Sequence, residues 1–261
     1  MSRATVTELI LEVGKAMILE KSEYQQRKDS ILGFVINEYI KNTAPVSSSY
    51  IAHEHFRRLS SATIRNILAE LEAQGYLTHP HTSAGRIPTE EGYRYYVDHL
   101  MREIQLLKAE KDKIKKEYEK NVRDLEFILE KTSEVIAGVT HYTAIVSVDG
   151  RKDQLFCRGT EYVVAYPLSE DLRTIKKILS VLEKKERILE VINRDLQNKI
   201  QIYIGHETAC AAIEECSLAV SKYKFDNGLS GRIAVLGPTR MNYQRVVSAL
   251  DYVSEYMKEI L

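Results

Sequence analysis

The chain has 261 residues, with 37 Lys and Arg against 37 Asp and Glu, so its formal net charge at pH 7 is +0. Hydrophobic residues make up 44% and charged residues 28%, which is the balance of a folded protein with room for two modest domains. No global field draws the chain to nucleic acid or to an anionic membrane. Any nucleic-acid contact must therefore come from local clustering of Lys and Arg.

Targeting and redox features favour a cytoplasmic protein. No segment approaches the roughly 18 consecutive apolar residues of a membrane span. Residues 1–20 mix Glu and Lys into their apolar run and do not resemble a secretory signal. The three cysteines, Cys157, Cys210 and Cys216, are odd in number and lack paired spacing, which argues against a disulfide framework.

Residues 1–26 are predicted to form an N-terminal extension that contains an amphipathic helix. Met17 is an alternative start, which would make residues 1–16 a mis-assigned extension. The residues alone leave the two alternatives open.

Residues 27–100 are predicted to fold as three short helices. Apolar residues recur at helical spacing over 31–40, and Pro45 ends this first helix. Ser47 is the expected N-cap of a second helix that runs to about Phe56, and Ser60 the N-cap of a third. The buried stripe of the third helix is predicted to be Ile64, Ile67, Leu68 and Leu71.

A hairpin is predicted to follow the third helix. Gly75 ends that helix in a left-handed conformation. Two short strands, 76–78 and 86–87, then flank a turn at residues 83–85, and Thr89 begins the next helix. Three helices and a basic hairpin in this order predict a winged helix-turn-helix, which reads DNA.

The third helix carries the residue types that suit the major groove. If its apolar stripe faces inward, Ser61, Ala62, Thr63, Arg65 and Asn66 face outward near its N-terminus. Arg can grip guanine O6 and N7, Asn can pair with adenine, and Thr or Ala can touch the thymine methyl group. The N–H groups that begin this helix, after Ser60, can hold a phosphate.

Further DNA contacts are expected beside this helix. Ser47 and Ser48 are candidate phosphate donors at the start of the second helix. Ser83 and Arg86 belong to the wing, where Arg86 would reach a phosphate or the minor groove. The full set of predicted DNA-binding residues is Ser47, Ser48, Ser60, Ser61, Thr63, Arg65, Asn66, Ser83 and Arg86.

Two other interpretations of this unit remain open: a three-helix unit with an ordinary polar face, and a winged helix that contacts protein. Arg57 and Arg58 add local positive charge, but four glutamates offset much of it. A single copy would therefore bind DNA weakly, and specific binding requires two. The four glutamates are Glu70, Glu72, Glu90 and Glu91.

Residues 101–138 are predicted to be a linker helix. Apolar residues recur there at alternating spacings of three and four, from Ile104 to Val135, with polar interruptions such as Asn121. This pattern fits a coiled-coil seam, or a single long helix that packs its stripe on its own domain.

Residues 139–261 are predicted to form an α+β domain with a mixed or antiparallel sheet, because strands and helices mix without strict β-α alternation. Helical segments are expected near 172–191 and over a last helix from Met241 to Ile260. The expected strands are Tyr142–Val148, Glu161–Tyr166, Ile200–Ile204, Ser217–Tyr223 and Arg232–Leu236.

The sequence shows no arrangement typical of a metal site or an enzyme. The pairs His53/His55 and His79/His81 lack cysteine or carboxylate ligands at zinc spacing. There is no Gly-rich phosphate loop and no Ser/His/Asp arrangement. We therefore expect no cofactor, no metal and no catalytic residue.

Several motifs in order resemble the HrcA family of heat-inducible transcription repressors. The N-terminal ones are Leu59-Ser60-Ser61-Ala62-Thr63-Ile64-Arg65-Asn66, His81-Thr82-Ser83-Ala84-Gly85-Arg86 and Gly92-Tyr93-Arg94-Tyr95-Tyr96. The C-terminal ones are Ile204-Gly205-His206-Glu207 and Gly237-Pro238-Thr239-Arg240-Met241. These motifs follow one another in order over most of residues 27–261.

The resemblance implies a winged helix-turn-helix followed by a GAF-like domain. It also implies a dimer that binds an inverted-repeat operator, called CIRCE, upstream of chaperone operons, with the GroE chaperonin keeping the repressor active. This chain is short after Tyr142–Val148, where the family usually carries an inserted dimerising subdomain. We expect the seam of 104–135 and the last helix to make the dimer instead.

Two rival functions remain. One is a winged-helix transcription regulator that senses a small molecule in the GAF-like domain. The other is an interaction protein whose winged helix docks another protein.

Overall fold

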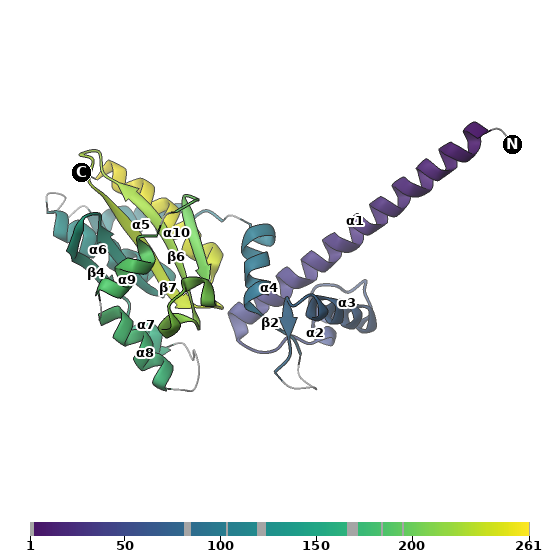
Figure 1. Ribbon diagram of the computed structural model, residues 1–261, viewed down its shortest axis with the longest axis horizontal. Helices are drawn as coiled ribbons and strands as arrows, with labels where there is room; N and C mark the ends of the chain where they lie inside the picture. The colour runs from purple at the N-terminus through teal and green to yellow at the C-terminus, as the bar shows by residue number, and fades with distance from the viewer. Residues whose placement is uncertain are drawn as a thin grey trace. The chain divides into compact units, whose positions relative to one another are not determined.

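The computed structural model describes residues 3–80, 85–102, 104–118, 124–165, 172–183, 185–194 and 196–260. The chain divides into two compact units, Met1–Met101 and Arg102–Leu261. Figure 1 labels most of their helices and several of their strands.

The N-terminal unit is helical with one small sheet (Figure 1). Its elements are α1 (Arg3–Asn42), α2 (Ser48–Glu54), α3 (Ser61–Ala73), β1 (Leu77–Thr78), β2 (Ile87–Pro88), α4 (Glu90–Tyr95) and a π-helical turn, Tyr96–Leu100. Strands β1 and β2 are antiparallel, with Leu77 opposite Pro88. The elements from α2 onward follow one another in the predicted order. The predicted separation of an extension at 1–26 from a short first helix is wrong, because α1 runs without a break through both.

Side-chain caps begin three of these helices where the sequence predicted them. Ser47 accepts a hydrogen bond from the backbone N of Tyr50 at 3.2 Å, and Ser60 accepts one from the backbone N of Thr63 at 3.0 Å. Thr89 caps α4 in the same way. Each cap satisfies an N–H group that has no partner inside its helix.

The core of the N-terminal unit forms where the apolar stripes of its helices meet. Gly75, with φ of +82°, ends α3 and turns the chain into β1. The predicted inward stripe of α3 is buried, and so is the apolar face of α1 between residues 31 and 36. The buried apolar side chains include Ile31, Leu32, Val35, Ile36, Ile51, Ile64, Ile67, Leu68, Leu71, Leu77, Tyr93 and Tyr96.

The C-terminal unit is built on a five-stranded antiparallel sheet in the order β4-β3-β7-β6-β5. The strands are β3 (Thr143–Val148), β4 (Arg151–Arg158), β5 (Ile200–Ile204), β6 (Cys216–Lys224) and β7 (Ser230–Pro238). The predicted combination of helices with an antiparallel sheet is confirmed.

Helices cover both faces of this sheet (Figure 1). On one face lie α6 (Leu125–Thr140) and α10 (Tyr243–Tyr256), with α5 (Lys108–Tyr118) packed against α6. On the other lie α7 (Glu161–Ala165), α8 (Leu172–Glu183) and α9 (Lys185–Ile192). Short 3-10 turns span Gly205–Thr208, Ala211–Ile213 and Met257–Glu259. Because the sheet is covered twice, all six residues of β3 are buried.

Two predictions about the sheet are wrong. The segment predicted as a strand at 161–166 is helix α7 in its described part, and β4 is a strand that the sequence did not predict. β4 pairs along β3 after a turn at Gly150, whose φ is +76°. It forms the edge of the sheet beside β3.

The prediction of one linker helix over 101–138 is also wrong. Described residues between 101 and 107 are not helical, and α5 and α6 are separate helices. Ile114, Tyr118 and Ile128 are buried inside the C-terminal unit, and the Tyr118 hydroxyl donates to Thr132 Oγ1 at 2.9 Å. These apolar positions pack against their own chain, so this seam is not free to pair with a second copy. Asn121 lies outside the described residues.

The cysteines are free thiols that pack into or against the apolar cluster between the sheet and α8 and α9. Burial raises the pKa of Cys157 to about 11 and that of Cys216 to about 12. Both thiols therefore stay protonated at neutral pH and behave as small apolar side chains.

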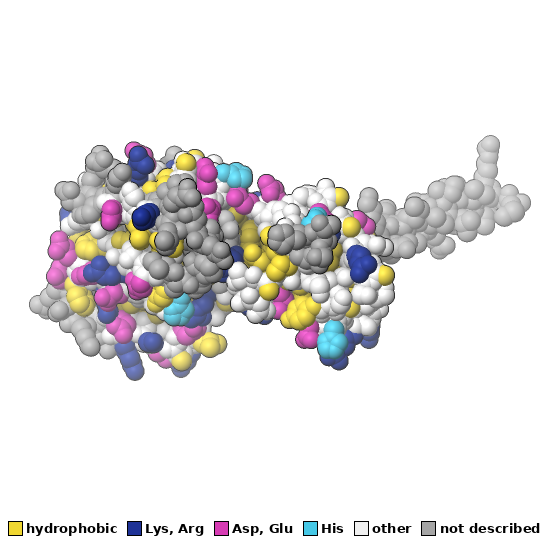
Figure 2. All heavy atoms as spheres, turned by 90° about the horizontal axis from the view of Figure 1, so that it is seen from below, with side chains coloured by type: hydrophobic (Ala, Val, Ile, Leu, Met, Phe, Trp, Pro, Cys, Tyr) yellow, Lys and Arg dark blue, Asp and Glu magenta, His cyan; other side chains and the backbone are white. Residues whose placement is uncertain are grey.

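The surface of the C-terminal unit carries charges of both signs. On the face that Figure 2 shows, Lys and Arg side chains are interspersed with Asp and Glu. No described helix is long and apolar enough to cross a membrane. Within the described part of the chain, no three His, Cys, Asp or Glu side chains group together in a way that could hold a metal ion.

Candidate nucleic-acid interface

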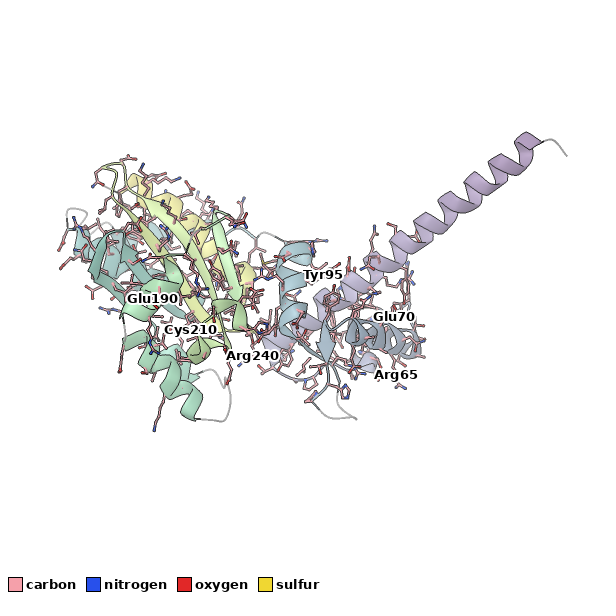
Figure 3. The ribbon with its side chains drawn as sticks, in the orientation of Figure 1. Arg65, Glu70, Tyr95, Glu190, Cys210 and Arg240 are labelled. Atoms are coloured by element: carbon pink, nitrogen blue, oxygen red, sulfur yellow. The ribbon has the colours of Figure 1, made fainter. Side chains whose placement is uncertain are left out.

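Helix α3 separates its side chains into an apolar face and a polar face. Ile64, Ile67, Leu68 and Leu71 are buried, whereas Ser61, Ala62, Thr63, Arg65 and Asn66 are exposed. In Figure 3, Arg65 points away from α1 and Glu70 points toward it. The exposed set includes one guanidinium, one amide and two hydroxyls at the N-terminal half of the helix. These groups match the donors and acceptors on base edges in the major groove.

The predicted serines serve the local fold as well as the surface. Ser60 Oγ accepts from the backbone N of Thr63 and also lies 2.9 Å from Thr63 Oγ1. Ser47 is exposed and caps α2, and Ser48 is half-buried. Arg65, in contrast, makes no ion pair with any described carboxylate. Its guanidinium is therefore the group on this face that is most available to a ligand. Ser83 lies outside the described residues.

Arg86 differs from the sequence expectation. Its Nη2 lies 2.7 Å from Glu72 Oε2 of α3, and the two side chains are 21% and 26% exposed. Its backbone also forms a two-way bridge with Val46, with both N–O distances at 2.9 Å. This guanidinium is already paired, so the structure shows it as a residue that positions the hairpin against α3.

Glu72 receives a second partner, because His79 Nδ1 at the end of β1 also bonds to its carboxylate. Burial raises the pKa of Glu72, but the His79 hydrogen bond and the charge of Arg86 outweigh it and hold that pKa below its usual value. The carboxylate thus joins α3 to both strands of the hairpin.

Gly85 allows the hairpin to approach the loop before α2. A Cβ on Gly85 would lie 2.5 Å from the backbone carbon and oxygen of Val46. No side chain larger than hydrogen fits there without a shift of backbone, which explains the glycine in the turn motif.

A further contact that the sequence did not predict fixes α3 against α1. Lys28 is only 4% exposed, and its Nζ lies 3.6 Å from Glu70 Oε2. The Tyr24 hydroxyl donates to Glu70 Oε1 at 2.6 Å. The residues are more than 40 positions apart, so no local pattern could have shown them to be partners. These contacts engage Glu70 on the side of α3 that faces α1, so its charge is directed away from the polar face.

Comparisons with known proteins show a similarity to heat-inducible transcription repressors. The profile described as "HrcA protein C terminal domain" matches residues 147–247. The chain is 28% identical to the "Heat-inducible transcription repressor HrcA" of Carboxydothermus hydrogenoformans, over 90% of this chain and 98% of that protein. It is 26% identical to the protein of the same name from Geobacter sulfurreducens, over 92% and 99% of the two chains. The chain is therefore similar to HrcA repressors over most of its length.

The chain is shorter than these relatives. The alignment with the C. hydrogenoformans protein is 334 positions long, which exceeds the 261 residues of this chain. A solved structure described as "a hypothetical protein at 2.2 A resolution" shares the fold, with a TM-score of 0.75 and 19% identity over 90% of this chain and 97% of its own.

Proposed function

We propose that the N-terminal unit is a winged helix-turn-helix and that α3 enters the major groove of DNA. The observation that carries this proposal is the exposed polar set on α3, with Arg65 making no ion pair to a described carboxylate, above a fully buried apolar stripe. Arg65 and Asn66 would contact base edges, and Ser61 and Thr63 would contact bases or the flanking phosphates.

The protein is, on this proposal, a cytoplasmic repressor of heat-shock chaperone operons. The relatives named heat-inducible transcription repressors support this function. The operator would be the CIRCE inverted repeat, and repression would occur by occlusion of polymerase. Activity would depend on the GroE chaperonin, as the family resemblance implies.

The protein would act as a homodimer, because an inverted repeat presents two half-sites related by two-fold symmetry. The buried side chains of α5 and α6 leave little of the predicted seam for this purpose. Only its N-terminal end remains open among the described residues, where Ile104 is 42% exposed and Leu107 is 70% exposed. The C-terminal unit would provide the rest of the interface through a GAF-like arrangement.

The test is equilibrium binding of the full chain to a CIRCE duplex and to a scrambled duplex across a salt series, with and without GroE. The expected result is tighter binding to CIRCE and a steep salt dependence, since counterions leave the phosphates when the protein binds. Equal, salt-independent failure to bind both duplexes would favour the alternative in which the unit docks another protein.

A second candidate function is a transcription regulator that senses a small molecule. A pocket of about 360 Å³ lies between α5 and α6 and is closed on one side by Arg245 of α10. Its wall contains the ion pairs Arg245–Glu110 at 2.7 Å and Lys131–Glu117 at 2.9 Å. The lining carries charges of both signs, and a thermal shift of the full chain against a panel of amino acids tests this function.

A further inference from the structure

An open pocket of about 660 Å³ lies in the N-terminal unit between α1 and the turn that joins α2 to α3. Its wall includes Arg27 on α1 and Arg57 and Arg58 in the turn, together with His55. All four side chains are exposed. Residues 27 and 57 are 30 positions apart in the chain, so the fold is what brings these cations to one pocket.

The charges of this pocket are unbalanced. Two carboxylates, Glu23 and Glu54, line it with the three guanidiniums. Glu54 is already engaged, because its Oε1 lies 2.9 Å from His53 Nδ1. No ion pair joins Arg27 or Arg58 to a carboxylate of the described residues, and Arg57 Nε donates only to the carbonyl of His53 at 3.2 Å.

The pocket also lies next to the start of α3. Leu59 lines it, and the following residue, Ser60, is the N-cap of α3. Elsewhere in this unit, comparable cations are neutralised: Arg86 pairs with Glu72 and Lys28 with Glu70. Among the described residues of this unit, guanidiniums without an ion pair are thus concentrated on Arg65 of α3 and on the pocket that precedes this helix.

We infer that this pocket, which we call the arginine pocket (Arg27, Arg57 and Arg58), binds a phosphate of the DNA backbone next to the base pairs that α3 reads. The inference rests on the proposed function. A guanidinium presents its N–H donors in a planar fork that matches two phosphate oxygens, which makes Arg well suited to this role. Contacts with phosphate carry no sequence information. The arginine pocket therefore sets the position of the protein along the DNA and the overall affinity, whereas Arg65 sets the preference for one base sequence over another.

The test uses the full chain with Arg27→Gln, Arg57→Gln and Arg58→Gln, singly and combined, and Lys41→Gln as a control. Lys41 is an exposed cation of the same unit that pairs with Glu38 and does not line the pocket. Log affinity is measured against log salt for the CIRCE and scrambled duplexes. Each substitution that removes an arginine–phosphate interaction should reduce the magnitude of this slope by about 0.9, equally on both duplexes. Lys41→Gln should leave the slope unchanged.

A second probe separates this inference from the proposed function. Inorganic pyrophosphate is titrated into the wild type and the triple variant while thermal unfolding is followed, and stabilisation of the wild type alone is expected. If CIRCE binding persists with an unchanged slope in the triple variant, the inference is overturned and the function stands. If no duplex binds but pyrophosphate stabilises only the wild type, the phosphate site stands and the DNA function does not. If neither the duplexes nor pyrophosphate bind, both the inference and the proposed function are overturned.

Discussion

Arg86 and Glu72 join the hairpin to the helix beside it, with 2.7 Å between Nη2 and Oε2. The sequence suggested that Arg86 would extend into a DNA groove. The structure instead shows this guanidinium in a partly buried ion pair with α3, which changes the expected effect of its removal.

Arg86→Ala should act mainly on stability. Removal of the guanidinium leaves the Glu72 carboxylate with His79 alone, and we expect the free energy of unfolding to fall by roughly 1–2 kcal/mol. Chemical denaturation measures this change. If the variant is as stable as the wild type but its affinity for DNA depends less steeply on salt, Arg86 contacts DNA, as the sequence suggested.

Arg65→Ala should act on recognition without loss of stability, because Arg65 is exposed and makes no ion pair with the described residues. Binding to CIRCE should weaken by roughly 1–3 kcal/mol, and the preference over a scrambled duplex should decrease. Competition binding with both duplexes checks this. An equal loss on both duplexes would mean that Arg65 contacts phosphate rather than a base.

Acid should weaken the attachment of the hairpin to α3. The pKa of Glu72 is held below its usual value in the folded state, so its contribution to stability is fully present at neutral pH. That contribution is lost as the pH falls below about 4.5, the ordinary pKa of a Glu carboxyl, through the folded value. Thermal unfolding of the wild type and of Glu72→Gln is measured at a series of pH values. The difference in stability between the two proteins should become smaller as the pH falls below about 4.5.

Gly85→Ala should disrupt the hairpin, because its Cβ would lie 2.5 Å from the backbone of Val46. We expect a loss of roughly 1–3 kcal/mol in the free energy of unfolding. Gly138→Ala is the matched control: it lies inside α6, and a Cβ there meets nothing within 4 Å. That change should stabilise the protein by roughly 0.5–1 kcal/mol, since Ala is the better helix former. Denaturant unfolding measures both variants. Changes of opposite sign in the free energy of unfolding would support the close approach of Gly85 to Val46.

Alkaline pH should weaken the packing of α5 on α6. Burial raises the pKa of Tyr118 well above its ordinary value of 10.0, so only the unfolded chain ionises readily there. The associated stability is present below pH 10 and is lost as the pH rises above it. Tyr118→Phe removes the bond to Thr132 and should cost about 1 kcal/mol at pH 7. In alkaline unfolding experiments, the variant should then lose less stability than the wild type.

Local chemistry made much of the N-terminal unit predictable. Serine and threonine caps, the left-handed Gly75 and the apolar period of α3 act within a few residues of one another, and the structure places them where the sequence predicted. The same applies to β3, β5, β6 and β7, whose segments carry β-branched or aromatic residues.

The errors arose where a distant partner decides the outcome. β4 is a strand because it pairs along β3, and the predicted strand at residues 161–166 is helix α7 in its described part. The apolar residues at positions 114–135 have a spacing that suits a coiled coil, yet Ile114, Tyr118, Ile128 and Val135 are buried against their own unit.

The sequence by itself therefore determined which residues of α3 face outward, because helical period and capping are local properties. Only the tertiary structure decided which charges on this unit remain available. Arg86 and Lys28 are neutralised by Glu72 and Glu70, whereas Arg65 makes no such ion pair with the described residues. Ion pairing depends on distances of a few ångströms between residues far apart in the chain, and those distances exist only after the core has formed.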